Sequence, residues 1–315
     1  MRTLRDTDEF TVTRFPRVAE GESMWLANRS KGVGGSDMSA IMGLDRYRTP
    51  YELWLDKTGR SEREDISGRW AIIRGNALES ELRRWYRARH PGVPVLDGTG
   101  FSLTSRAHPH MLASLDGVIW DPDRGPGVLE CKTASSYRAR DWRSDDGTPV
   151  APDYYMAQVT HYLAVTGWTW GAFVADLGSG EPVEVEFQRD EEDVAAVVRA
   201  AEEFWGYVER DEPPTLTGSD VERVYPEPEE GVVEADGDGF DQLAADYLDW
   251  SEAESDARRS KAEVGERIKA LIGSHEGMSD ATYKATFKHY KRPAHMVAES
   301  SGRTLRVRKI EGKGK

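Results

Sequence analysis

The chain has 315 residues, a net charge of -14 at pH 7 and a single cysteine, Cys131. This length allows one large domain or two ordinary ones, and one thiol excludes an intramolecular disulfide framework and a cysteine-cluster zinc site. No apolar run of about 18 residues exists, and the N-terminus is too polar for a signal peptide. The composition therefore predicts a cytoplasmic protein that does not contact a membrane.

Charge is distributed unevenly along the chain. Acidic residues far outnumber basic ones between residues 181 and 256, whereas basic residues predominate between 284 and 315. Phosphate neutralisation needs Lys and Arg, so the overall charge argues against indiscriminate tight binding of DNA. It is compatible with an enzyme that engages DNA only inside a restricted groove.

The first predicted element is a glycine-rich turn before a short helix, over residues 32–44. Ser36 or Asp37 could cap this helix, and helix N-termini with free N–H groups and a hydroxyl bind phosphate. Arg29, just upstream, could add a bidentate contact. The alternative is an ordinary N-cap in which the glycines only ease the turn.

A longer helix is predicted over residues 75–90, GNALESELRRWYRARH. Glu79 shares a helix face with Leu82 and Tyr86, which favours an inward carboxylate near a metal site. The competing interpretation is structural: Asn76 as N-cap and Glu79 three residues later would form a capping-box-like pair.

The most informative segment is LASLDGVIWDPDRGPGVLECKT, residues 112–133. Residues 118–120 and 128–132 have the composition of strands, and the Pro, Gly and Asp between them predict a turn. A β-hairpin is therefore the simplest local structure.

This hairpin would bring charged side chains together. Residues two apart on a strand share a face, so Glu130 and Lys132 would project together while Cys131 points into the opposite layer. Asp116, at the mouth of the first strand, would then meet Glu130. Two carboxylates and a backbone carbonyl, such as that of Cys131, suffice for Mg²⁺, which keeps several waters. Lys132 would orient a water or offset phosphate charge. The alternative interpretation of the whole hairpin is an exposed turn with a surface salt bridge.

Two further polar residues are candidates. Gln158 lies in an aromatic and apolar stripe of the predicted helix DYYMAQVTHYLAVTG, which ends at Gly167. A buried amide needs a partner, and a nucleophilic water, a scissile phosphate or a backbone carbonyl would serve. Ser114 could hold a phosphate oxygen or simply bond to backbone at a strand end.

The chain is predicted to have three parts. Residues 1–217 carry the motif-rich sequence, in which strands alternate with helices, and residues 218–239 form an acidic linker or excursion rich in Pro and Gly. Residues 240–315 would form a C-terminal helix and a small basic β-hairpin.

In this last part the helical pattern covers residues 240–272, and the two basic strands are residues 283–292 and 303–310. The hairpin could touch a DNA backbone. The alternative interpretation is that the hairpin is a solvated, positively charged surface without a partner.

Together the motifs resemble the YqaJ-like viral recombinase family, which is related to bacteriophage lambda exonuclease within the PD-(D/E)xK nuclease superfamily. Five motifs between residues 27 and 178 stand in the family's order: GVGGSDMSAIMGLDRYRTPYELWLDKTG, RGNALESEL, ASLDGVI, GVLECKT and YYMAQVTHYLAVTG. The resemblance implies an α/β (α+β) fold, with a restriction-endonuclease-like core of a mixed central sheet flanked by helices. Leu115 stands where the superfamily name expects proline, which shapes backbone and not chemistry.

The resemblance also implies roles for the candidate residues. Asp116 and Glu130 match the metal-binding acids, with the backbone carbonyl of Cys131 as a further ligand, and Lys132 matches the catalytic lysine. Glu79 matches a helix glutamate near a second metal ion. The implied cofactor is Mg²⁺, with Mn²⁺ as a substitute and two ions bound.

Gln158 matches the glutamine that helps to position nucleophile and phosphate. The residues that match the family's pocket for a 5′-phosphate are Arg29, Ser36 and Ser114. The expected protein is a Mg²⁺-dependent exonuclease of a phage or prophage in a bacterial host, which resects linear double-stranded DNA ends 5′ to 3′ in homologous recombination.

Its expected partner is a single-strand-annealing recombinase protein, and a homo-oligomer, a trimer, is implied by the resemblance. One alternative is a structure-specific or nicking endonuclease on the same core. Another is a catalytically silent DNA-binding module, against which the presence of Asp116, Glu130 and Lys132 counts.

Overall fold

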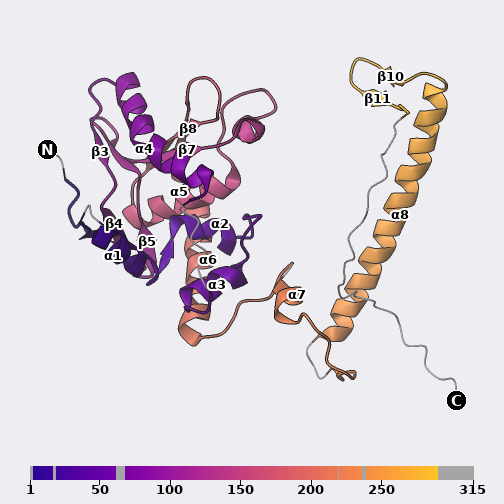
Figure 1. Cartoon of the computed structure of the whole chain (residues 1–315), viewed down its shortest axis with the longest axis horizontal. Coiled ribbons are helices and arrows are strands. Elements are labelled where there is room, and N and C mark those ends of the chain that lie inside the picture. Colours follow the sequence, from indigo (N-terminus) through magenta and orange to yellow (C-terminus); the bar gives the residue numbers. More distant parts are fainter. Residues whose placement is uncertain (1–2, 17–18, 62–67, 219, 236–238, 290–315) are drawn as a thin grey trace. The chain divides into compact units, whose positions relative to one another are not determined.

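The structure is a computed structural model that divides into two compact units, residues 1–221 and 222–315, which are described separately (Figure 1). The described residues are 3–16, 19–61, 68–218, 220–235 and 239–289. The boundaries predicted at residues 217 and 239 stay predictions.

The first unit contains a mixed five-stranded sheet in the order β3-β6-β7-β8-β9. Its strands are β3 (Val95–Asp97), β6 (Gly117–Asp121), β7 (Gly125–Thr133), β8 (Trp170–Asp176) and β9 (Val183–Gln188). β6 and β7 form the predicted antiparallel hairpin, whereas β7 and β8 run parallel. Parallel neighbours need a crossover, and the chain supplies one through the 3₁₀ helix Ser136–Trp142 and α5 (Asp153–Thr166).

Helices cover both faces of this sheet (Figure 1). On one face, α4 (Trp70–Arg89) packs its Leu82 and Tyr86 against Leu129 of β7. On the other, α5 and α6 (Glu191–Arg210) belong to the core that includes Val128. The predicted mixed sheet flanked by helices is confirmed.

A second sheet, four-stranded, has the order β1-β4-β5-β2. Its strands are β1 (Phe10–Arg14), β4 (Phe101–Ser105), β5 (Met111–Ala113) and β2 (Val33–Gly34). The remaining helices of this unit are α1 (Ala19–Arg29), the 3₁₀ helix Gly35–Asp37, α2 (Met38–Ile41) and α3 (Pro50–Lys57), and α7 (Asp220–Val224) lies at its end. Since α5 contacts β4 and β5 as well as β7, it joins the two sheets.

One predicted helix start and one predicted capping interaction are wrong. α4 begins at Trp70, so Asn76 is not an N-cap and Glu79 lies in the helix interior, which excludes the capping-box pairing. Asp37 precedes α2, but neither its side chain nor that of Ser36 caps that helix. The Asp37 carboxylate instead accepts a hydrogen bond from Gly34 N on its Oδ2, at 3.0 Å, and forms an ion pair described below.

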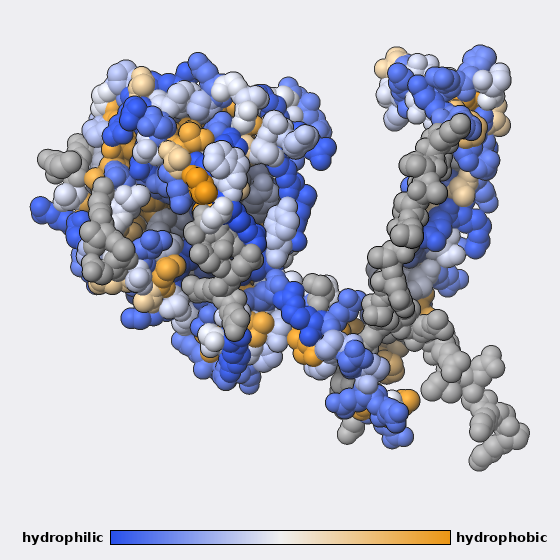
Figure 2. Space-filling model, in the orientation of Figure 1, coloured by the Kyte–Doolittle hydropathy of each residue, from blue (hydrophilic) through white to orange (hydrophobic). Residues whose placement is uncertain are grey.

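The second unit contains α8 (Phe240–Ile272), which confirms the predicted helix, and the strands β10 (Gly277–Ser279) and β11 (Lys284–Thr286). β11 lies within the predicted strand 283–292, but its partner is β10. The predicted second strand, 303–310, lies outside the described residues. Hydrophilic side chains dominate the visible surface (Figure 2), and no helix in the described ranges is long and apolar enough to span a bilayer.

Candidate active site

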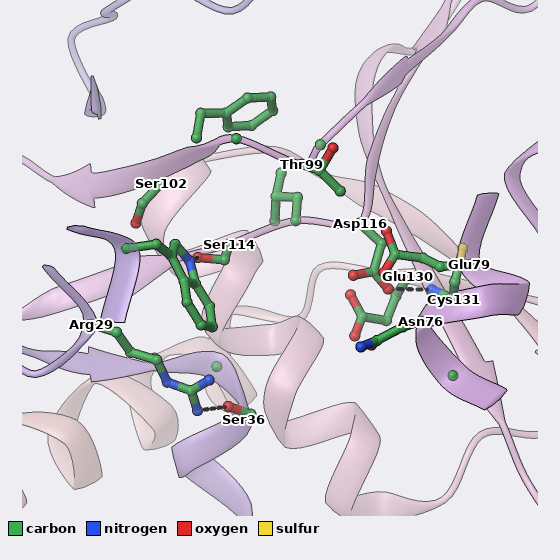
Figure 3. A pocket seen from close by; sticks show the side chains of 18 of the residues that line it. Arg29, Ser36, Asn76, Glu79, Thr99, Ser102, Ser114, Asp116, Glu130 and Cys131 are labelled. Carbon is green, nitrogen blue, oxygen red and sulfur yellow. Dashed lines mark hydrogen bonds between the residues drawn. The ribbon is translucent and has the colours of Figure 1, made fainter. Parts of the chain in front are cut away.

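All nine predicted site residues line one cavity of about 1010 Å³ in the first unit. They come from loops and elements far apart in sequence, which the two sheets and α5 bring together. In Figure 3 the labelled carboxylates lie on one side of the cavity, and Arg29, Ser36 and Ser114 lie on the other. The cavity therefore has an acidic end and a hydroxyl-and-guanidinium end.

The hairpin positions the acidic end as predicted. Asp116 precedes β6, and the backbone N–H of Cys131 donates to its Oδ2 at 2.7 Å. Glu130 and Lys132 share a face of β7, and Lys132 Nζ donates to Glu130 Oε1 at 2.7 Å. Cys131 packs with the α4-side core, in the opposite layer.

Gln158 of α5 completes this cluster. Its Nε2 donates to Glu130 Oε1 at 2.6 Å and to the Tyr162 hydroxyl at 2.9 Å, while its Oε1 accepts from Lys132 Nζ at 2.8 Å. The partners of the buried amide are thus side chains rather than a backbone carbonyl. Because both ends of the amide are bonded, the head groups of Glu130 and Lys132 are fixed relative to each other. Lys132 Nζ also lies 4.5 Å from the ring centre of Tyr155.

Burial and mutual repulsion dominate the electrostatics of the acids. Burial raises the pKa of Asp116 well above its usual value, and the charges of Glu130 and Glu79 add to this. Burial likewise raises the pKa of Glu130, although Lys132 acts in the opposite direction. For Lys132, burial alone would lower the pKa, but Glu130 and Asp116 outweigh it and raise it. The acidic end is therefore short of positive charge.

Arg83 is a site residue that sequence reasoning missed. It is 7% exposed, and its Nη1 donates to Glu79 Oε1 and, at 3.0 Å, to the carbonyl of Asp116. Its Nη2 lies 3.4 Å from Asp97 Oδ1. Arg83 thus links the Glu79 carboxylate to the backbone that carries Asp116. The spacing of four residues between Glu79 and Arg83 on a helix was the available signal.

The carboxylates of Asp116 and Glu130 are the groups in the acidic end that could hold a cation. Within the described residues no group of three or more His, Cys, Asp and Glu side chains is arranged to hold a metal ion. However, Glu130 Oε2 is buried without a hydrogen-bond partner, an arrangement that native structures rarely leave uncompensated. Burial also raises the pKa of the Cys131 thiol, which stays neutral. Two carboxylates, from Asp116 and Glu130, fit a hard cation that keeps water ligands.

The opposite end contains the three residues predicted to bind phosphate. Arg29 Nη2 donates to Ser36 Oγ at 2.5 Å, and Ser114 Oγ accepts from Trp25 Nε1 at 3.0 Å. The Arg29 guanidinium also lies 5.4 Å from the Trp25 ring centre. Arg29 and Ser36 are therefore in direct contact, and Trp25 connects them to Ser114.

A buried ion pair supports this end. Lys57 Nζ lies 2.7 Å from Asp37 Oδ2, with both side chains 2% exposed, and it donates to the carbonyls of Gly32 at 2.7 Å and Arg29 at 3.2 Å. Burial alone would raise the pKa of Asp37, but Lys57 and Arg29 outweigh it and hold the pKa well below its usual value. Sequence reasoning named Asp37 only as a cap and missed Lys57, whose position follows from tertiary packing.

A family model and two proteins of known sequence are similar to parts of this chain. The family model described as the YqaJ-like viral recombinase domain matches residues 24–169. The uncharacterized protein YqaJ of Bacillus subtilis is 34% identical over 204 residues, which cover 64% of this chain and 61% of that protein. An uncharacterized protein of Acanthamoeba polyphaga mimivirus is 26% identical over 169 residues, 51% of this chain and 30% of that protein. The chain thus spans less than two thirds of each relative.

Solved structures give weaker similarities. The alkaline exonuclease LHK-Exo from Laribacter hongkongensis, including its complex with dAMP, is 22% identical with a TM-score of 0.47, and the match covers 60% of this chain and 93% of that one. A phage-related exonuclease from Haemophilus somnus is 16% identical with a TM-score of 0.36, covering 57% and 96%. Similarity of this degree assigns no activity or substrate to this chain.

Proposed function

We propose, because residues 24–169 match the family model of the YqaJ-like viral recombinase domain, that this protein is a metal-dependent deoxyribonuclease that resects linear double-stranded DNA ends as an exonuclease. The observation that carries the proposal is the buried, unpartnered Oε2 of Glu130. It lies in the same cavity as Lys132 and the Arg29–Ser36 pair, so one cavity offers a cation position, a fixed ammonium group and an anion position.

The cofactor would be Mg²⁺, with Mn²⁺ as a substitute. Asp116, Glu130 and the backbone carbonyl of Cys131 would hold one ion, and Glu79 would serve a second. Such an ion supplies Lewis-acid stabilisation of charge on the scissile phosphate. Arg83 would share Glu79 with that second ion, since it already bonds to one oxygen of that carboxylate.

The protein's own groups would position the reacting phosphate. The Lys132 ammonium, fixed by Glu130 and Gln158, would offset negative charge that develops on the phosphate. Gln158 would orient the attacking water or a phosphate oxygen, because its amide is fixed by Glu130 and Tyr162. Fixed groups of this kind lower the barrier without reorganising during the reaction.

The opposite end of the cavity would receive the terminal 5′-phosphate. Arg29 provides a planar guanidinium suited to a phosphate, and the hydroxyls of Ser36 and Ser114 could each bond a phosphate oxygen. This arrangement supports a 5′ to 3′ direction. The biological setting we propose is phage-type recombination with a single-strand-annealing partner.

The test uses the full chain with Mg²⁺ and linear duplex DNA that carries or lacks 5′-phosphates. Lys132→Met keeps the length of the side chain and removes its charge, and we expect digestion to fall by about 10²-fold or more. Lys31→Met, at an exposed position, is the matched control. Arg29→Met should reduce the preference for 5′-phosphorylated ends.

Three results would contradict the proposal. Unchanged digestion by Lys132→Met would refute the site assignment. Digestion of circular duplex as fast as linear duplex would favour a nicking or structure-specific endonuclease. Binding of DNA without digestion by the unaltered protein, with Mg²⁺ or Mn²⁺, would favour a silent DNA-binding module.

A further inference from the structure

α8 carries an apolar stripe that no described part of the second unit covers. The apolar side chains of the stripe are Leu243, Tyr247, Trp250, Val264, Ile268 and Leu271. Trp250 is 76% exposed, Leu271 69% and Leu243 66%. Along the helix only Ile272 is buried. Aligned apolar side chains of this size, left in water, mark a surface that binds a partner.

The spacing of the stripe specifies the kind of partner. Its six apolar positions, together with Glu254, Ala257 and Lys261 in the middle, alternate by four and three residues over the whole helix. This is the heptad pattern of a helix that packs against another helix. α8 is 33 residues long, which gives about 50 Å of seam at 1.5 Å per residue.

The two charges at the centre decide how a second copy of α8 would pair. In a parallel pair in register, Glu254 would face Glu254 and Lys261 would face Lys261, and both layers would be repulsive. When the second helix runs in the opposite direction, its stripe still has three apolar positions at each end, but Glu254 and Lys261 change places. In an antiparallel pair that crosses at Ala257, each Glu254 therefore lies within about one residue, roughly 1.5 Å along the helix axis, of the level of Lys261 of the second copy.

The charges are available for such a pairing. Lys261 makes no ion pair with any described residue, and Glu254 has only an exposed pair with Arg258, at 3.1 Å, which contributes little. Flanking the stripe, Asp246 of one helix would come opposite Arg267 of the other, again with opposite signs. Ala257 is small enough to let the two helices approach at the crossing point.

We propose that α8 is a dimerisation helix that pairs antiparallel with α8 of a second copy of this chain. Such an interface is isologous and closed, so that it produces dimers and not open chains. The inference does not depend on the proposed nuclease activity, since it uses only residues of the second unit.

The experiment measures the mass of the full chain in solution, by sedimentation or light scattering, over a range of concentrations. The variants are Glu254→Lys, Lys261→Glu and the double exchange. Each single change places like charges in the seam, so the dissociation constant of the dimer should rise about tenfold or more, and the double exchange should restore it. The unaltered chain should reach twice its 35.3 kDa. Glu263→Lys, exposed on the opposite helix face, is the charge-matched control and should leave the dimer unchanged.

Circular dichroism of each variant checks that α8 still forms. A chain that keeps the mass of one copy at every concentration would overturn the proposal, and would indicate that another segment of the same chain covers the stripe. An oligomer that neither single exchange weakens would also overturn it, because association would then occur elsewhere or through a parallel pair of helices.

Discussion

Replacing Lys57 with methionine tests the buried ion pair beneath the proposed phosphate end. The side chain keeps its length but loses its charge, which leaves the Asp37 carboxylate, 2% exposed, without the ammonium that now lies 2.7 Å away. The carbonyls of Gly32 and Arg29 lose a donor as well. Since these carbonyls belong to the segment that carries Arg29 and Ser36, stability and phosphate recognition should both decline.

The expected loss can be estimated from these contacts. Removing one partner of a buried pair costs about 3–5 kcal/mol, and each lost hydrogen bond to a carbonyl about 1 kcal/mol. Arg29 and Arg48, at 3.4 and 3.7 Å from Asp37 Oδ1, remain and offset part of the loss. We therefore expect a decrease of about 3–5 kcal/mol in the free energy of unfolding of the first unit.

The assay is urea unfolding of the full chain, followed by fluorescence of its ten tryptophans. Lys31→Met, which removes an exposed lysine, is the control and should change stability by less than about 0.5 kcal/mol. Asp37→Asn combined with Lys57→Met should recover part of the loss, because no unpaired charge remains buried. A loss below about 1 kcal/mol for Lys57→Met alone would refute the reasoning.

Two further predictions concern α5 and the loop that packs on it. Burial lowers the pKa of His161 from 6.5 to about 4. Because the folded state favours the neutral ring, the contribution of His161 to the free energy of unfolding is fully present above about pH 6.5. That contribution declines as the pH falls towards 4. His161→Gln should therefore remove about 2 kcal/mol of the stability difference between about pH 7 and pH 5 in urea titrations, and an unaltered pH dependence would contradict this. A Cβ on Gly35 would lie 2.4 Å from the Tyr162 ring and 2.9 Å from the Gln158 carbonyl, so Gly35→Ala should destabilise by about 1–3 kcal/mol in thermal unfolding. Gly68→Ala, with open space around it, is the control; equal melting temperatures for the two variants would disprove the close approach.

The acidic end of the cavity could be predicted from sequence because its geometry is local. Strand alternation alone places Glu130 and Lys132 on one face, and a short turn brings Asp116 beside Cys131. The helix that carries Gln158 ends at Gly167, whose φ of 68° is the left-handed conformation that glycine adopts readily. These features depend on few neighbours, so the sequence pattern specifies them.

The start of α4 and the supporting ion pairs could not be predicted in the same way. α4 begins after Arg69, which makes no side-chain capping bond, so the usual signal for a helix start is missing and the Asn76–Glu79 spacing was misleading. Lys57 reaches Asp37 only because α3 packs beside the loop. Arg83 meets the Asp116 carbonyl only after α4 docks on the sheet. Each of these contacts joins segments whose proximity is a property of the whole first unit.

The parallel pairing of β7 with β8 has a consequence for the order in which the protein folds. The β6–β7 hairpin joins residues close in sequence, so it can form while later residues are still being synthesised. Gln158 reaches Glu130 only when α5 has crossed over and β8 has paired with β7. A nascent chain that has emerged only as far as Thr133 would hold its two carboxylates together without the amide that fixes Lys132. We therefore expect the proposed hydrolytic activity to appear late in folding, after the crossover closes, so that incomplete chains would lack it.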